Sequence, residues 1–184
     1  WGHRVSDARR SSCTCARIEI RSLRGNVQTR LRHLDEGDFD AIILAAAGLK
    51  RLGLAERICS FIDTETSIPA AGQGVMAVEA RSDDKETLDL ISFLHDSDVA
   101  SCITTERAFL AKVGGDCKVP AGIYATAKDG GIEAHAFIAS TDGKRLYRSE
   151  RSAAVSEAVS VGKALAAELL DAGGREVLEE MQKI

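Results

Sequence analysis

The chain has 184 residues, of which 45% are hydrophobic, as expected for a globular protein with a buried core that forms one domain or two small ones. An aromatic content of 4% and a net charge of −4 argue against a nucleic-acid-binding surface. No window approaches the roughly 18 consecutive apolar residues of a membrane span, and the N-terminus lacks the apolar run of a secretory signal. We therefore expect a cytoplasmic protein. The five cysteines are odd in number and have no repeating spacing, which favours reduced thiols.

Residues 1–17 show neither helical nor strand periodicity, and we describe them as irregular. Regular patterns begin with a strand candidate at 18–23. Asn26 can then cap a helix over 27–34, and the apolar run 39–46 has the composition of a strand covered on both faces of a parallel sheet. The order strand, helix, strand predicts a βαβ unit.

A second group of elements follows before residue 96. We expect a short helix at 48–54, strands at 59–62 and 75–80, and a flexible hinge at 71–74 (AGQG). Asp83 or Asp84 can cap a helix with Leu88, Ile91 and Leu94 on one side.

The order of the predicted elements changes in the last ninety residues or so. A long helix is predicted at 98–113, ending at Gly114 and Gly115. A period of two then indicates an antiparallel meander, and two helices close the chain; the strands are 123–127, 132–139 and 145–151, and the helices 153–171 and 175–183. The fold class is thus an α/β unit followed by a compact α+β unit.

Three constellations could carry chemistry. Arg21, Arg24 and Arg30 lie near a strand-to-helix junction, where guanidinium groups and free backbone N–H groups favour carboxylates. Lys50 and Arg51 follow the predicted buried strand, at the edge where ligands bind open α/β sheets. A solvated basic surface is the alternative in both places.

The third constellation is Cys117 in VGGDCKVPAG. Its glycines make the thiol accessible, Lys118 favours the thiolate and the C-terminal end of the preceding helix opposes it, so the local sequence leaves its pKa open. Taken alone, this cysteine could be a bystander. We predict structural roles for several other polar or reactive residues. Cys59 and Cys102 are expected in the core, and Glu106 and Arg107 are expected to form an exposed pair. No metal-ligand pattern surrounds His33, His95 or His135 in the sequence.

Taken together, several segments resemble one family. They are IRSLRGNVQTRL, FDAIILAAAGLKRLGL, IPAAGQGVMAVEAR, TTERAFLAKVGGDCKVPAGIYA and LAAELLDAGGREVL, and they resemble hydroxymethylbilane synthase (porphobilinogen deaminase) over about residues 18–184. The resemblance implies a transferase that joins four porphobilinogen molecules head to tail, each losing ammonia, in tetrapyrrole biosynthesis. It also implies a covalently attached dipyrromethane cofactor.

The resemblance also implies roles for individual residues. Cys117 would carry the cofactor through a thioether, Arg24 would bind its carboxylates, and Arg30, Arg51 and Gln73 would bind substrate. The partners implied are porphobilinogen and the growing polypyrrole, without a metal, nucleic acid, membrane or obligate protein partner.

The family fold has three domains, two of them resembling the lobes of periplasmic binding proteins. By this resemblance, residues 18–68 are the latter part of the second α/β domain, 69–95 the hinge and return segment of the first domain, and 96–184 the cofactor-carrying C-terminal domain. Residues 1–17 do not match the family pattern. The N-terminal third of the family, with its catalytic aspartate, has no counterpart here, so no residue receives that role. A non-catalytic fragment and an anion-binding module are the alternatives.

Overall fold

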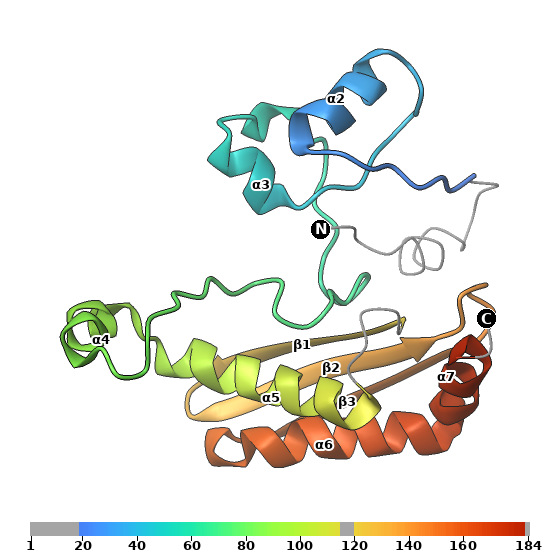
Figure 1. The fold of residues 1–184 in the computed structure, drawn as a ribbon. Helices are drawn as coiled ribbons and strands as arrows, with labels where there is room; N and C mark the ends of the chain where they lie inside the picture. The colour runs from blue at the N-terminus through green and yellow to red at the C-terminus, as the bar shows by residue number, and fades with distance from the viewer. Residues whose placement is uncertain (1–18, 115–119, 183–184) are drawn as a thin grey trace. The chain divides into compact units, whose positions relative to one another are not determined.

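A computed structural model describes residues 19–114 and 120–182 of the chain (Figure 1). The chain divides between Ser67 and Ile68 into two compact units, which are considered separately. Residues 1–67 belong to the first unit and residues 68–184 to the second.

The described part of the first unit is built from short helices. They are α2 (Val27–Asp35), α3 (Ala46–Arg51) and the 3-10 helix η1 (Ala55–Arg57). Asn26 caps α2, as predicted, because its side-chain oxygen accepts a hydrogen bond of 2.8 Å from the Thr29 amide. Leu31 on α2 and Leu49 on α3 are the buried apolar side chains among the residues described in this unit.

The βαβ prediction is wrong for the described residues: no strand forms between residues 19 and 114. The segments predicted as strands leave large apolar side chains exposed, with 54% of Ile43, 66% of Phe61 and 58% of Val78 accessible to solvent. A strand exists only when a neighbour completes its backbone hydrogen bonds, and an apolar pattern does not supply that neighbour. None of these segments pairs with another part of the described chain in a sheet.

The second unit contains the longer elements. Its helices are α4 (Lys85–Ile91), α5 (Ser97–Val113), α6 (Ala158–Leu169) and α7 (Arg175–Gln182), with the short helical segments η2 (Ser92–Leu94), η3 (Val155–Glu157) and η4 (Leu170–Gly174). Its strands are β1 (Ala121–Lys128), β2 (Gly131–Ala139) and β3 (Leu146–Ala154). The predicted meander and the two closing helices are therefore confirmed.

Local signals place the ends of the helices. Asp84 caps α4 through the Thr87 amide at 3.1 Å, and Asp96 caps α5 through the Val99 amide at 3.0 Å. Gly114 ends α5 with φ at +103°, a left-handed conformation that glycine adopts without steric cost.

The three strands form one antiparallel sheet in the order β1-β2-β3. Lys128 pairs with Gly131 across the first turn, which leaves Asp129 and Gly130 as its two central residues. Both have positive φ, +53° and +77°, as the tight turn of a twisted two-residue hairpin requires.

Helices α5 and α6 lie side by side on one face of this sheet (Figure 1). They approach so closely that a Cβ on Gly162 of α6 would overlap the backbone oxygen of Thr105 on α5. The interior between helices and sheet contains the largest fully buried apolar side chains: Phe109, Ile123, Ile132, Ile138, Leu165, Leu169 and Val177.

The beginning of the second unit runs along β1. The amide of Ile123 donates a hydrogen bond of 3.1 Å to the carbonyl of Pro69, and the Ile68 side chain is buried with Phe137. A Cβ on Gly122 would lie 2.7 Å from the Pro69 oxygen, so only glycine permits this close approach. The hinge predicted at 71–74 therefore starts from a point fastened to the sheet.

A search of the described helices finds none that is both long enough and apolar enough to cross a membrane.

Candidate functional site

The arginine-rich junction leads directly into α2. Gly25 has φ at +116°, and Arg30 donates a hydrogen bond of 2.8 Å from its Nε to the Gly25 carbonyl. This bond fastens the first turn of α2 to the chain before it. Arg24 precedes Gly25, is exposed, and makes no hydrogen bond or ion pair with the described residues.

The charge distribution at this junction favours an anion. The first turn of α2 contains no acidic residue, and the positive end of the helix dipole lies there together with Arg24 and Arg30. A guanidinium group binds a carboxylate through two parallel hydrogen bonds. Arg24 is therefore available for a carboxylate ligand, while Arg30 is partly committed to the backbone.

Arg21, the third arginine of the constellation, is already engaged. Its Nη2 donates to the Asp38 carbonyl at 2.6 Å, its guanidinium carbon lies 4.8 Å from the centre of the Phe39 ring, and Glu19 is 3.7 Å away. Arg21 consequently helps to hold the loop after α2.

Lys50 and Arg51 lie in the last turn of α3. Lys50 places its ammonium group 5.1 Å from the centre of the Phe61 ring, and Arg51 is exposed. Helix α3 approaches α2 where Val27 faces Gly48, so the arginines of both helices belong to one unit. Arg24, Arg30 and Arg51 thus share the first unit.

Gln73 belongs to the second unit and lies in a turn. Its side chain is exposed, and its amide donates a hydrogen bond of 3.3 Å to the Ala70 carbonyl. The residue before it, Gly72, has φ at +78° and donates its amide to the carboxylate of Glu106 at 2.6 Å. The turn that carries Gln73 is therefore tied to helix α5.

Glu106 is buried, so the prediction that it forms an exposed pair with Arg107 is wrong. Its side chain is only 6% exposed, and its other oxygen accepts a hydrogen bond of 3.1 Å from the Ala125 amide. Burial raises the pKa of Glu106, although the hydrogen bonds from Gly72 and Ala125 oppose that shift. The helical spacing from Cys102 through Glu106 to Phe109 and Val113 could have indicated a buried face.

Cys117, the predicted cofactor anchor, lies outside the described residues, as do Asp116 and Lys118. The described chain flanks this position with Gly114 at the end of α5 and Ala121 at the start of β1. The role of Cys117 therefore stays a prediction.

Two other cysteines are described, and both are free thiols. Cys59 is exposed, so the prediction that it is a core residue is wrong. The described segment in which it lies forms no strand. Cys102 is partly buried against the core. Burial raises the pKa of its thiol, and the nearby carboxylates of Glu106 and Asp98 raise it further, which makes Cys102 a poor nucleophile.

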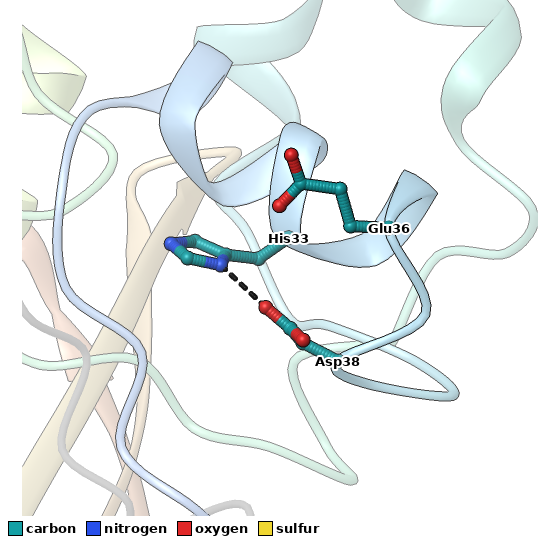
Figure 2. A group of neighbouring side chains, drawn as sticks. All are labelled: His33, Glu36 and Asp38. Atoms are coloured by element: carbon teal, nitrogen blue, oxygen red, sulfur yellow. Dashed lines mark hydrogen bonds and ion pairs between the residues drawn. The ribbon is translucent and has the colours of Figure 1, made fainter.

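One group at the end of α2 has side chains that a metal ion could use. Figure 2 shows His33, Glu36 and Asp38, whose ligand atoms lie within 4.8 Å of one another. The position of His33 in the sequence predicts no metal-ligand pattern around it. The Nδ1 of His33 is 2.7 Å from an oxygen of Asp38, Arg32 pairs with Glu36 at 3.8 Å, and Arg21 binds the Asp38 carbonyl. Because Arg32 already pairs with the Glu36 carboxylate and Arg21 with the backbone of Asp38, these contacts fasten the loop after α2.

Comparisons with known proteins agree with the resemblance seen in the sequence. Residues 5–89 match a family model described as "Porphobilinogen deaminase, dipyromethane cofactor binding domain", and residues 100–171 match "Porphobilinogen deaminase, C-terminal domain". The first match begins within the stretch 1–17 that the sequence analysis treats as unlike the family.

Two curated relatives are both named porphobilinogen deaminase. The protein from Syntrophobacter fumaroxidans is 45% identical over 166 residues, which are 90% of this chain and 54% of the relative. That from Roseiflexus castenholzii is 49% identical over 161 residues, which are 88% of this chain and 53% of the relative. The chain thus spans about half the length of these relatives. With both domain models matched in series, the chain belongs to the porphobilinogen deaminase family.

Proposed function

We propose that the protein acts as a hydroxymethylbilane synthase, which joins four porphobilinogen molecules head to tail with release of ammonia. The observation that carries this proposal is the match to both family domains in series, at 45% identity over 90% of the chain. The reaction belongs to tetrapyrrole biosynthesis and makes the protein a transferase.

The first unit offers a site suited to the substrate's charge. Every pyrrole ring of the product carries acetate and propionate groups, so the growing chain is a polyanion. In our proposal Arg24 binds carboxylates of the cofactor, because it is exposed, unpaired among the described residues and next to a helix N-terminus. Arg30, Arg51 and Gln73 bind substrate carboxylates or position the growing chain.

The cofactor of the proposal is a dipyrromethane held by Cys117 through a thioether. The family model that matches residues 5–89 is that of a dipyrromethane cofactor binding domain. The exposed guanidinium group of Arg24, at the start of α2, fits a ligand with several carboxylates. When bound, the group supplies the terminal pyrrole to which further pyrroles are added. The residues of this chain then bind the carboxylates and hold the thioether.

The finer description of the fold is part of the same proposal. We infer that residues 18–68 are the latter part of an α/β domain resembling a periplasmic-binding-protein lobe, that 69–95 return through the other lobe, and that 96–184 form the domain carrying Cys117. The matches of residues 5–89 and 100–171 to two different family models support a division of the chain near residue 96. We also propose a cytoplasmic location, since an odd number of unpatterned cysteines is typical of reducing compartments.

The test is to express the 184-residue chain, incubate it with porphobilinogen, and measure both intact mass and release of tetrapyrrole. A mass gain of pyrrole units with released product supports the synthase. A gain without product supports a protein that holds the cofactor and does not turn over. No gain and no product would contradict the proposal and leave a non-catalytic fragment. We expect a gain with slow release, because the family resemblance assigns the role of the catalytic aspartate to no residue in the sequence given, and losing a general acid–base group typically costs about 10²- to 10⁴-fold in rate.

A further inference from the structure

Glu106 is a buried carboxylate that bridges two backbone segments. One oxygen accepts the amide of Gly72 at 2.6 Å, and the other accepts the amide of Ala125 at 3.1 Å. The two partners are 34 and 19 residues away from Glu106 in the sequence. A carboxylate with one strong backbone bond on each oxygen holds both segments at a fixed separation.

On the sheet side, Glu106 takes the place of a neighbouring strand. Strand β1 lies at the edge of the sheet, so alternate amides on its outer side need acceptors from elsewhere. The Ile123 amide finds the Pro69 carbonyl at 3.1 Å, and two residues further on the Ala125 amide finds Glu106. The carboxylate thus continues the row of acceptors that the chain before the hinge begins.

On the hinge side, the same carboxylate fixes the turn of residues 70–74. Ala71 packs against the core beneath this turn, and Gly72 holds φ at +78°, where its amide meets Glu106. Gln73 is the next residue, with its side chain exposed.

From this geometry we infer that Glu106 is a positioning residue, whose carboxylate fastens the turn carrying Gln73 to the edge of β1. Only the use of Gln73 by substrate rests on the function proposed above; the fastening itself is a property of the second unit. Glu106 does not contact substrate in this account, and it acts through Gln73.

A carboxylate suits this role better than a carboxamide. An ionised carboxylate only accepts hydrogen bonds, so both oxygens can face N–H donors. In Glu106→Gln one oxygen becomes an NH₂ group, which cannot accept a bond from Gly72 or Ala125. Glu106→Asp keeps the charge but is one methylene shorter, so it cannot span both segments without movement.

Amide hydrogen exchange, followed by NMR on the full chain without substrate, tests the fastening. In Glu106→Gln the NH₂ group faces one of the two amides of Gly72 and Ala125, and we expect that amide to exchange about tenfold to a hundredfold faster, since hydrogen bonds to charged groups contribute roughly 1.5–3 kcal/mol. The amide of Ile138 in the core should be unchanged, which shows that the variant is folded.

Two further variants keep the result interpretable. Glu168→Gln is the matched control, because Glu168 also accepts hydrogen bonds, from Ser149 and Arg151, yet lies on the exposed side of α6. If Glu106→Gln does not fold, Glu106→Asp is examined in the same way. Unchanged exchange at both Gly72 and Ala125 in a folded Glu106 variant would overturn the inference.

A second measurement separates this inference from the proposed function. The rate of pyrrole addition from porphobilinogen is followed by intact mass for wild type, Gln73→Ala, Glu106→Gln and the double variant. If Glu106 acts through Gln73, both single variants are slower than wild type and the double variant is no slower than the slower single. Independent, multiplicative slowing would contradict the route through Gln73. If wild type adds no pyrrole, the proposed function fails, and hydrogen exchange alone decides whether Glu106 fastens the turn.

Discussion

Arg24 and Glu106 show opposite relations between a charged residue and the fold. Arg24 is exposed and unpaired among the described residues, whereas Glu106 is buried and satisfied by two backbone amides. The first pattern is typical of a residue that binds something from solvent, and the second of one that organises the protein itself. The sequence motif predicted that Arg24 binds a ligand. The burial of Glu106 could not be predicted in this way, because its hydrogen-bond donors lie 34 and 19 residues away in the sequence.

The proposed role of Arg24 predicts a specific loss in Arg24→Gln. We expect pyrrole addition from porphobilinogen to slow by about tenfold to a hundredfold, because a charge-assisted hydrogen bond is worth roughly 1.5–3 kcal/mol. Intact mass measured over time gives the rate.

Arg32→Gln is the control, since Arg32 lies in the last turn of the same helix and pairs with Glu36 at the surface. It should behave as wild type. Equal rates for Arg24→Gln and wild type would remove Arg24 from the site.

The raised pKa of Glu106 also gives a prediction for how the stability of the fold depends on pH. Its pKa is raised in the folded protein above the ordinary value of 4.5, so the folded state binds this proton more tightly than the unfolded state. The contribution to stability is therefore fully present below about pH 4.5 and is lost as pH rises through the folded pKa. Glu106→Gln should flatten this dependence, as measured by urea denaturation across that range. A variant whose stability follows pH in the same way as wild type would show that another group is responsible.

At the scale of elements, the sequence predicted what is decided locally. The caps at Asn26 and Asp84, the Asp-Gly turn between β1 and β2, and the end of α5 at Gly114 all depend on residues within a few positions. Among the described residues, the strands predicted before residue 96 do not form, because strand pairing is non-local. An apolar pattern shows that a segment could be covered, but it does not show which segment would pair with it. The exposure of Cys59 has the same origin.

The contact between α5 and α6 gives a prediction for Gly162→Ala. The added methyl would overlap backbone atoms of α5, which cannot move aside as a flexible side chain can. We expect destabilisation of the second unit by about 1–3 kcal/mol, the usual cost of overpacking, despite alanine's better helix propensity. Chemical denaturation followed by circular dichroism measures it.

Gly48→Ala in α3 is the matched substitution. A Cβ there would lie 3.7 Å from Val27, an ordinary contact, so this change should stabilise its helix by up to about 1 kcal/mol. If Gly162→Ala were as stable as wild type, the close helix packing described for the second unit would be wrong.

At the scale of the whole molecule, family membership was accessible from the sequence while much of the site was not. Separate motifs in the right order identified the family, and the comparisons confirm it over 90% of the chain. The predicted site residues divide between the two units, with Arg24, Arg30 and Arg51 in the first and Gln73 in the second. Whether a set of residues binds one ligand depends on tertiary structure, which no local pattern encodes.

In the proposed function, Cys117 carries a chain of pyrroles. The most direct test of this is intact mass after incubation with porphobilinogen for wild type, Cys117→Ser and Cys59→Ser, the last removing an exposed free thiol as a control. We expect wild type and Cys59→Ser to gain the mass of pyrrole units and Cys117→Ser to gain none. An equal gain in Cys117→Ser, or no gain in wild type, would contradict it.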